Sequence, residues 1–424
     1  MFIRNFEKIA TRPQRKIVLE LVETALSSIQ PENVINNSIK LENNILRISD
    51  KSFDLGGFER IFLIGFGKGS AKNSRLIKEK LGNRLVESYV IDTNSEDFKK
   101  IKFTQGTHPL PSQTNVDFTD SLIKRFTEIN PTRKDLVIVV ITGGGSALFE
   151  KPYRVDLEKL IQINDALLKS GANIKEMNTV RKHLSSVKGG GLAKHLYPAT
   201  IVSIIASDVP GNDLSVISSG PTVKDPTTID DALSISTSLT RSDLVTKDYL
   251  TETPKEDKYF EKISNILILS NLTALEAMKK KAEELGFKAE ILSDKFQGEA
   301  RNTGSDLVSK TTPSSILLIG GETTVKVTGS GKGGRNQEVV LGALSNIDDK
   351  TVICSFDSDG WDNSPFAGAI GDIETLEKAK KLNLNPQEFL DNNNSLEFFQ
   401  KTGDGIETGR LPSNVSDLMI VLKD

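Results

Sequence analysis

Cysteine, histidine and tryptophan are scarce in this chain of 424 residues, and neither sign of charge dominates it. The single cysteine, Cys354, lies in the apolar run TVICSF, so an internal disulfide is impossible and no cysteine-based zinc site is expected. The three histidines, His108, His183 and His195, offer few partners for a Ser-His-Asp triad, and we interpret each as structural or solvated. The 54 basic and 57 acidic residues nearly cancel, which argues against a general nucleic-acid binder.

Long apolar runs are also missing. No segment approaches the length of a membrane span, so no membrane partner is expected. The first residues, MFIRNFEKIATRPQRK, begin with charges and lead directly into an amphipathic helix pattern, without the apolar core and small-residue cleavage site of a signal peptide. The sequence therefore predicts a cytoplasmic protein.

Short β-branched runs recur along the chain, each closed by Gly, Ser or Asp and most followed by a helical pattern. They are RIFLIGFGKGS, DLVIVVITGGGS, ATIVSIIASDVPG, NILILSN, SILLIGGETT and TVICSFDSDG. Continuous apolar strands that alternate with helices indicate parallel sheet buried on both faces, and hence a doubly wound α/β fold. In such sheets ligands bind at the carboxyl ends of the strands, where these Gly, Ser and Asp residues fall.

The length of the chain predicts two domains. A polar stretch at residues 240–262 is either a linker or a helical insertion with a charged outer face. Composition alone places the division there, which gives an N-terminal domain of residues 1–254 and a C-terminal domain of residues 255–424.

One glycine-rich stretch, TTVKVTGSGKGGRNQE at residues 323–338, runs from a strand pattern into a helical pattern, with Lys332 and Arg335 among its glycines. Successive glycines let backbone N–H groups approach an anion, and the dipole of the following helix favours negative charge. Gly329, Gly331 and Gly334 match G-x-G-x-x-G, which makes a nicotinamide-dependent reductase one interpretation, although the two cations weigh against it. A Walker A loop fails, because Lys332 is followed by glycine.

Two further loops repeat this arrangement. In LIGFGKGSAKNS, glycines turn the chain after a strand and Lys68 stands where a helix begins, so its ammonium can hold a phosphate or carboxylate as a point charge. In VVITGGGSALFEKP, Leu148 breaks the G-x-S-x-G spacing of a hydrolase nucleophile. Residues 143–146 therefore fit an oxyanion or phosphate cradle better.

Acidic residues follow two of the predicted strands. Asp208 comes directly after one, and Asp357, Asp359 and Asp362 follow another. A carboxylate just past a parallel strand can hold Mg²⁺ or accept a hydroxyl proton, whereas for Asp362 alone a helix cap or turn is the simpler interpretation. Several glycine loops with dispersed cations and acids, and no nucleophile–base pair, indicate an ATP-dependent kinase of a small anionic substrate.

Six long motifs occur along the chain: GFGKGSA, ITGGGSAL, MNTVRKHLSSVKGGGLA, SDVPGNDLSVISSGPTVKDPTT, GGETTVKVTGSGKGGRNQE and DSDGWDNSPFAGA. In sequence and in order they closely resemble the motifs of the glycerate 2-kinase family, the class II glycerate kinases with a C-terminal MOFRL domain. The resemblance implies a Rossmann-like N-terminal domain and an α/β MOFRL domain, with the active site in the cleft between them. It also implies transfer of the ATP γ-phosphate to the 2-hydroxyl of D-glycerate with Mg²⁺, in an Entner–Doudoroff variant or another glycerate-producing pathway.

Carried over residue by residue, the resemblance implies that Lys68 and Arg335 are the active-site lysine and arginine, with Asp208 beside them as an acid. Asp208 and Asp359 are the expected metal ligands. The expected cofactor-binding residues, which would line the nucleotide or substrate cleft, are Gly143, Gly144, Gly145, Ser146, Lys188, Gly220, Thr222, Glu322, Gly331, Gly333, Gly334 and Asn336. A homodimer is a further expectation that the sequence itself does not test.

The chain departs from the family pattern in two places. The usual Thr-Asp-Gly-x-Asp-Gly-Pro stretch appears as SDGWDNSP, with Trp361 at the variable position and Asn363–Ser364 where a single glycine is usual. The usual TGPT-x-TNVNDL appears as TGRLPSNVSDL, which moves the proline. Two rivals stay open: a hydroxypyruvate reductase, with which members of this family have been confused, and a nucleotide-binding sensor, although a sensor would be expected to lose Lys68 or Arg335.

Overall fold

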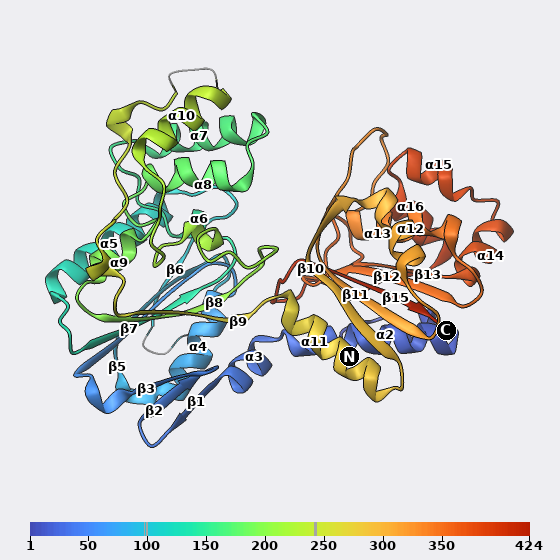
Figure 1. Ribbon diagram of the computed structural model, residues 1–424, viewed down its shortest axis with the longest axis horizontal. Coiled ribbons are helices and arrows are strands. Elements are labelled where there is room, and N and C mark those ends of the chain that lie inside the picture. The colour runs from blue at the N-terminus through green and yellow to red at the C-terminus, as the bar shows by residue number, and fades with distance from the viewer. Residues whose placement is uncertain (97, 99–100, 241–243) are drawn as a thin grey trace. The chain divides into compact units, whose positions relative to one another are not determined.

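The chain divides into two compact units (Figure 1) in a computed structural model that describes residues 1–96, 98, 101–240 and 244–424. Unit 1 comprises Met1–Asn33 together with Leu269–Asp424, and unit 2 comprises Val34–Ile268. The described helices include none with the length and apolar character needed to cross a membrane.

Unit 2 is built on a six-stranded sheet in the order β6-β5-β4-β7-β8-β9, and its pairs from β6 to β8 run parallel. The strands are β4 (Arg60–Phe66), β5 (Leu85–Asp92), β6 (Lys102–Gln105), β7 (Asp135–Ile141), β8 (Thr200–Ala206) and β9 (Ile263–Leu269). Counted from β4, this is the order 3-2-1-4-5-6 of dinucleotide-binding folds. The predicted doubly wound domain is confirmed, and the strand order reverses between β4 and β7.

Both faces of this sheet are buried. Phe62 and Phe66 of β4 pack with α5 (Gln113–Ile129) and α9 (Gly191–Leu196) on one face. Leu63, which points the opposite way, packs with α4 (Ser70–Leu81) on the other. This two-sided burial is why the strands appear in the sequence as continuous apolar runs.

Smaller elements complete unit 2. A helical cluster of α7 (Leu157–Lys169), α8 (Ile174–His183) and α10 (Ile229–Thr240) also buries Val245 and Leu250. The polar stretch is therefore packed into unit 2 where it is described, and its residues 241–243 lie outside the described part. The remaining elements are α3 (Pro31–Ser38), β1 (Ile39–Glu42), β2 (Ile45–Ile48), β3 (Lys51–Asp54), α6 (Gly145–Leu148) and the 3₁₀ turns η1 (Leu55–Gly57), η2 (Gly82–Arg84), η3 (Ile217–Ser219), η4 (Lys247–Tyr249) and η5 (Asp257–Tyr259).

Unit 1 carries a second six-stranded sheet in the order β10-β11-β15-β12-β13-β14. The strands are β10 (Lys288–Glu299), β11 (Ser315–Thr324), β12 (Thr351–Asp357), β13 (Gly368–Gly371), β14 (Gly405–Ile406) and β15 (Asp417–Lys423). β10 and β11 pair in parallel, but β15 lies between β11 and β12 and is antiparallel to both. The parallel sheet predicted from the runs in β11 and β12 is wrong here, because an apolar run reports burial of both faces and says nothing of strand direction.

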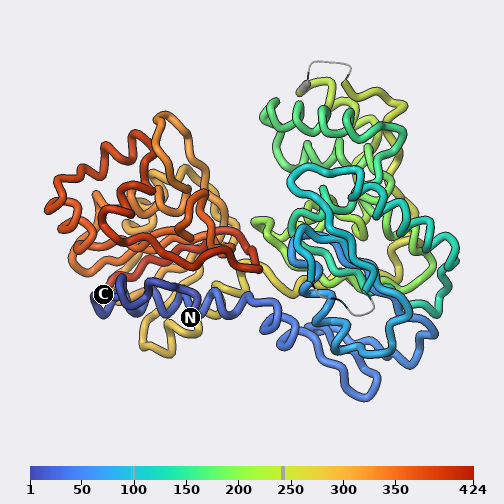
Figure 2. Tube along the Cα trace, turned by 180° about the vertical axis from the view of Figure 1, so that it is seen from behind, coloured from blue at the N-terminus to red at the C-terminus, as the bar shows by residue number. Residues whose placement is uncertain are grey.

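Helices cover both faces of this second sheet. α2 (Pro13–Ser28) and α11 (Asn271–Glu284) lie together on one face, and α12 (Ala300–Lys310) and α13 (Arg335–Ala343) lie on the other (Figure 1). Figure 2 shows the N-terminal helix, in blue, running beside the C-terminal strand, in red. The other elements are α1 (Phe6–Ile9), α14 (Ile373–Lys381), α15 (Pro386–Asp391), α16 (Ser395–Thr402) and η6 (Leu344–Asn346).

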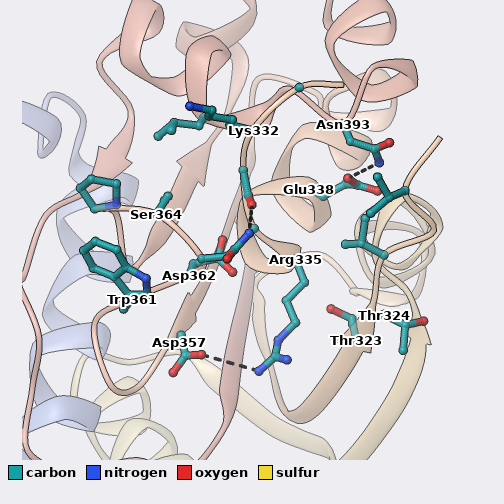
Figure 3. A pocket seen from close by; sticks show the side chains of 18 of the residues that line it. Thr323, Thr324, Lys332, Arg335, Glu338, Asp357, Trp361, Asp362, Ser364 and Asn393 are labelled. Atoms are coloured by element: carbon teal, nitrogen blue, oxygen red, sulfur yellow. Dashed lines mark hydrogen bonds and ion pairs between the residues drawn. The ribbon is translucent and has the colours of Figure 1, made fainter. Parts of the chain in front are cut away.

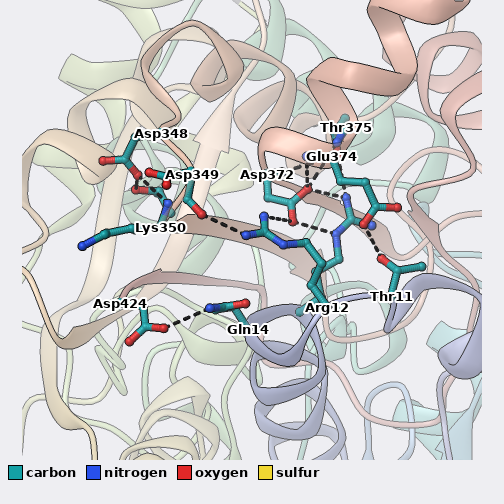
Figure 4. Close-up of polar contacts among 12 residues, drawn as sticks. Thr11, Arg12, Gln14, Asp348, Asp349, Lys350, Asp372, Glu374, Thr375 and Asp424 are labelled. Atoms are coloured by element: carbon teal, nitrogen blue, oxygen red, sulfur yellow. Dashed lines mark hydrogen bonds and ion pairs between the residues drawn. The ribbon is translucent and has the colours of Figure 1, made fainter.

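A buried arginine anchors the N-terminus in unit 1. The Arg15 guanidinium is fully buried and forms ion pairs of 2.6 Å with Asp372 and 2.7 Å with Asp404. Nearby, Arg12 pairs with Asp372 at 3.2 Å, and Thr11 donates a hydrogen bond to Glu374 (Figure 4). These contacts explain why residues 1–33 belong with the C-terminal unit.

The compact units thus differ from the division proposed at residue 254. The sequence composition changes there, but β9 begins at Ile263 and completes the sheet of unit 2. The chain therefore passes from unit 2 back into unit 1 only between Ile268 and Leu269. The cleft between the domains stays a prediction, since the structure describes each unit by itself.

We predict that Arg15→Met lowers the free energy of unfolding of unit 1 by about 3–5 kcal/mol, because it removes the one fully buried cation of Asp372 and Asp404 and leaves them only the partly exposed Arg12 and Lys378. Arg12→Met, which removes a partly exposed guanidinium, is the matched control and is expected to cost at most about 1 kcal/mol. Urea titrations followed by the fluorescence of Trp361, the single tryptophan, report on this unit. Equal losses in the two variants would contradict the anchoring role of Arg15.

Candidate active site

Two glycine loops meet in unit 2 where the strand order reverses. Gly67, after β4, has φ +112°, and a Cβ on it would collide with the backbone of Thr142, after β7. The N–H of Lys68 donates to the carbonyl of Gly143 at 2.8 Å. The glycine is therefore required for the two loops to approach, and the loops hold each other at the position where such folds bind ligands.

Three chemically active side chains surround the second of these loops. A Cβ on Gly143 would collide with the carboxylate of Asp208. A Cβ on Gly144, whose φ is +77°, would lie 2.7 Å from the His108 ring and 3.3 Å from Lys68 Cε. Asp208, predicted at the end of β8, and Lys68, predicted at the end of β4, are thus brought to one place.

His108 is the member of this group that sequence reasoning missed. Partial burial and the nearby Lys68 ammonium lower the pKa of His108, which favours the neutral imidazole. The local sequence THPLP gives no sign that this histidine lies in a site. Its neighbours in space, Gly144 and Lys68, follow other strands of the sheet.

The loop also presents backbone donors and hydroxyls. Among the described residues, the N–H groups of Gly143 and Gly144 have no backbone acceptor. Ser146 Oγ lies 3.0 Å from Ser219 Oγ, which donates to Asn178 at 2.7 Å. Open N–H groups beside an ammonium can hold the oxygens of a phosphate or carboxylate.

The start of α4, below the Lys68 loop, is already occupied by a carboxylate of the chain. Asp92, the buried last residue of β5, accepts the Ala71 N–H at 3.0 Å. Burial raises the pKa of Asp92, although the N–H donors around it act to lower it. An acid at the end of a strand was the available signal, and sequence reasoning did not single it out.

Unit 1 holds a cavity of about 1080 Å³ beside the loop that leads into α13. Figure 3 shows Arg335 in the middle of it, with Trp361 on one side and Thr323 and Thr324 on the other. The predicted residues Glu322, Gly331, Gly333, Gly334 and Arg335 all line this cavity.

Most of the glycine loop binds to its own chain. The N–H groups of residues 328–332 all donate to the run Asn392–Asn394, at donor–acceptor distances of 2.7 to 3.2 Å. Among the described contacts, the N–H groups of Gly333, Gly334 and Arg335 have no protein acceptor. Within residues 328–335, open N–H donors are therefore found only at the two residues before α13 and at its first residue. Sequence reasoning missed the asparagine run, although asparagines are common in turns.

Asp362 fills the N-terminus of α13. Its carboxylate accepts the backbone N–H groups of Asn336 at 3.1 Å and Gln337 at 2.9 Å, and the Gln337 side chain at 2.9 Å. A Cβ on Gly334 would collide with Asp362, so this glycine serves the internal carboxylate. Asp362 is not the N-cap residue, which is Gly334, but its carboxylate reaches this helix from a loop later in the chain, so part of the anion predicted at this helix belongs to the protein itself.

Arg335 is surrounded by carboxylates. Its Nε lies 2.7 Å from Asp417, its Nη1 contacts Glu322, and its Nη2 lies 3.6 Å from Asp357, a pair marked in Figure 3. Burial raises the pKa of Asp357, and the neighbouring Asp417 raises it further. Arg335 and Glu322 both line the cavity, and Glu322 is half-exposed.

Several predicted residues have internal partners. Lys188 is buried in an ion pair with Glu150. Burial lowers the pKa of Lys188, and Glu150 acts against this shift. The buried Thr222 donates to Asn265 at 2.7 Å, and Asn336 donates to Asp417 at 2.8 Å. The ligand contacts predicted for Lys188, Thr222 and Asn336 therefore gain no support from the geometry.

Gly220 and Asp359 have turn roles. Gly220 has φ +60° and its carbonyl accepts the Gly190 N–H at 2.8 Å. Asp359 accepts the Trp361 N–H at 2.8 Å. The described residues contain no group of three or more His, Cys, Asp or Glu side chains arranged around a metal position.

The G-x-G-x-x-G match does not have the topology of a dinucleotide site. Such a site needs two neighbouring parallel strands, whereas β15 separates β11 from β12. Asp357, the acid that follows the matching glycines at the end of β12, pairs with Arg335 instead of standing free for a ribose. The Rossmann topology lies in unit 2, away in the chain from the matching glycines.

Comparison with known proteins gives the same assignment. The family described as "Domain of unknown function (DUF4147)" matches residues 17–250, and the MOFRL family matches residues 315–417. A glycerate 2-kinase of Pyrococcus horikoshii is 37% identical, with 96% of this chain and 97% of that protein covered. A crystal structure of a glycerate kinase from Thermotoga maritima has a TM-score of 0.86 at 31% identity, with 96% of this chain and 99% of that chain covered. A protein of Agrobacterium vitis called a putative hydroxypyruvate reductase is 31% identical, with 96% and 94% covered.

The fold and the two glycine-loop regions define a two-unit α/β protein with a Rossmann sheet in one unit and a mixed sheet in the other. The chain belongs to the glycerate 2-kinase family, with its MOFRL region in the C-terminal part.

The raised pKa of Asp417 predicts a pH-dependent stability. Burial raises this pKa to about 6, against the lowering effect of Arg335. The folded state therefore binds the proton more tightly than the unfolded state, so the stabilisation is present below about pH 4 and is lost as pH rises through about 6. Between pH 4 and 7 we expect the wild type to lose about 2 kcal/mol relative to Asp417→Asn, measured by urea titration. Parallel pH curves for the two proteins would contradict this assignment.

Proposed function

We propose that this protein transfers the γ-phosphoryl group of ATP to the 2-hydroxyl of D-glycerate, giving 2-phosphoglycerate and ADP. The observation that carries the proposal is the gathering of Lys68, Asp208 and the open N–H groups of Gly143 and Gly144 at the switch point of a Rossmann sheet. Related proteins named glycerate 2-kinase support the substrate. Phosphoryl transfer needs positioning and charge neutralisation more than a covalent nucleophile, which suits this set of groups.

In unit 2, we assign the Lys68 ammonium to an anionic oxygen of the phosphate or of the glycerate carboxylate. The N–H groups of Gly143 and Gly144 donate to further oxygens of the same group. Asp208 lies at the end of β8 beside these donors, in a position to accept a hydrogen bond from the attacking hydroxyl.

In unit 1, we assign Arg335 to a second anionic group. Asp417 holds Nε and orients the guanidinium, whose Nη1 and Nη2 contact Glu322 and Asp357, two residues that line the cavity. A bidentate anion would displace the half-exposed Glu322 from Nη1. The oxygen that leaves ATP gains negative charge as the phosphorus–oxygen bond breaks, and a guanidinium stabilises such charge.

Mg²⁺ is part of the proposal through Asp208. Magnesium in kinases takes one or two carboxylates and completes its shell with water and phosphate oxygens, so a partly exposed carboxylate beside open N–H groups fits it. The ion would neutralise phosphate charge when bound. Asp359, the other expected ligand, lies in unit 1 with one oxygen committed to the Trp361 N–H, and its role stays a prediction. A cytoplasmic location and a homodimer also stay predictions.

Incubation of the purified protein with D-glycerate, ATP and MgCl₂, followed by phosphorus NMR, tests the reaction. We expect a 2-phosphoglycerate signal together with ADP. A 3-phosphoglycerate signal would retain the kinase and overturn the regiochemistry. Oxidation of NADH by hydroxypyruvate, with no ATP-dependent product, would favour the reductase instead.

Lys68→Ala and Arg335→Ala are each expected to reduce kcat by about 10²- to 10³-fold, because each removes a charge from a developing anion. The matched controls are Lys40→Ala and Lys326→Ala, which remove exposed lysines of the same two units and are expected to leave kcat unchanged. Circular dichroism confirms that each variant is folded. Near-normal turnover in a folded Lys68 or Arg335 variant would remove that residue from the active site.

A further inference from the structure

One wall of the cavity in unit 1 is apolar, and the proposed function gives its side chains no role. This wall consists of Val325, Val327, Trp361, Pro365 and Leu396. Val327 is 73% exposed and Trp361 is 37% exposed, which places both among the exposed large apolar side chains of the described residues. Apolar side chains exposed together inside a concave cavity are typical of a ligand site.

Four carboxylates line the same cavity, and each is bound within the protein: Glu322 and Asp357 by Arg335, Glu338 by Asn393 and Asp362 by the Gln337 N–H. The open N–H groups of Gly333, Gly334 and Arg335, together with the exposed ammonium of Lys332, lie along the loop that enters α13. Figure 3 shows Lys332 and Trp361 on the same side of the cavity. The groups left without a protein partner, the apolar wall and the open N–H groups with Lys332, fit an occupant that combines an apolar ring with an anionic group. A nucleotide has this character. Glycerate is small and polar throughout, and it has no apolar surface that could pack on the wall.

Trp361 is held in place from behind by a residue from another loop. The guanidinium of Arg410 lies 4.3 Å from the centroid of the indole ring, a cation–π contact that fixes one face. Trp361 and Arg410 stand in the two stretches where this chain departs from the pattern of its family. Asn363 and Ser364, from the first of these stretches, bind Gly333 O at 3.0 Å and the Gln337 side chain at 2.9 Å. The departures thus meet at one wall of one cavity.

We propose that this cavity is the nucleotide subsite, in which the base of the nucleotide packs on the Trp361 wall and its phosphates bind the N–H groups of residues 333–335 and Lys332. This inference rests on the proposed function for the identity of the ligand as ATP. The Trp361–Arg410 pair then determines how tightly this chain binds the base. Stacking of a base on an aromatic ring tolerates different bases, so the wall also predicts use of GTP alongside ATP.

Trp361 is the only tryptophan of the chain, so intrinsic fluorescence reports directly on the wall. We expect ADP to quench the emission with saturation, and neither inorganic tripolyphosphate nor D-glycerate to do so. Trp361→Ala is expected to raise the KM for ATP by about 5- to 100-fold and to leave the KM for D-glycerate unchanged, the range that loss of one stacking contact gives. Trp361→Phe, which keeps a ring, is expected to restore most of the affinity for ATP. Leu382→Ala, which truncates an exposed leucine of the same unit outside the cavity, is the control.

The outcomes separate this inference from the proposed function. If the wild type forms 2-phosphoglycerate but ADP leaves the fluorescence unchanged and Trp361→Ala leaves the KM for ATP unchanged, the nucleotide subsite is overturned and the kinase stands. If ADP quenches the emission but no phosphorylated product forms, the subsite stands and the proposed reaction is overturned. Equal quenching by tripolyphosphate would limit the site to phosphates and would overturn the base-binding wall.

Discussion

A buried carboxylate at the start of a helix sets the geometry of both glycine-loop regions. Asp92 occupies the N-terminus of α4 in unit 2, and Asp362 occupies the N-terminus of α13 in unit 1. Each satisfies backbone N–H groups that would otherwise be orphaned, and each fixes the loop that precedes its helix. Because both carboxylates are buried, they stabilise the folded loops. A ligand anion must therefore bind to N–H groups that these carboxylates do not occupy.

This constraint divides the glycines into two kinds. Gly67 and Gly334 are required by close approach within the protein, to Thr142 and to Asp362 respectively. Gly143 and Gly144 have open N–H groups and lie against groups that can act on a ligand. A glycine-rich sequence is therefore a mixture of folding and binding signals, and density of glycine alone overstates how much backbone is left for a phosphate.

The sequence was sufficient to predict features with a local signal, such as strands and the loops at their ends. It was insufficient to predict which strands pair and which distant side chains meet. Residues such as Lys68 and Asp208 were predicted to converge because strand ends of a parallel sheet share one edge. The position of β15 between β11 and β12 could not be read from an apolar run, and neither could the pairing of Arg15 with Asp372, since partners more than 350 residues apart in sequence leave no local pattern. His108 was missed for the same reason.

Internal carboxylates at the helix starts also explain why the loops carry cations. A phosphate at an open helix N-terminus is stabilised by the dipole and by backbone donors. At α4 and α13 that stabilisation is already used by Asp92 and Asp362, and each adds negative charge close to the loop. An incoming anion therefore needs a compensating positive charge from a side chain, which Lys68 supplies in one unit and Arg335 in the other. The buried carboxylates that order the loops are thus also the reason that the loops need cations.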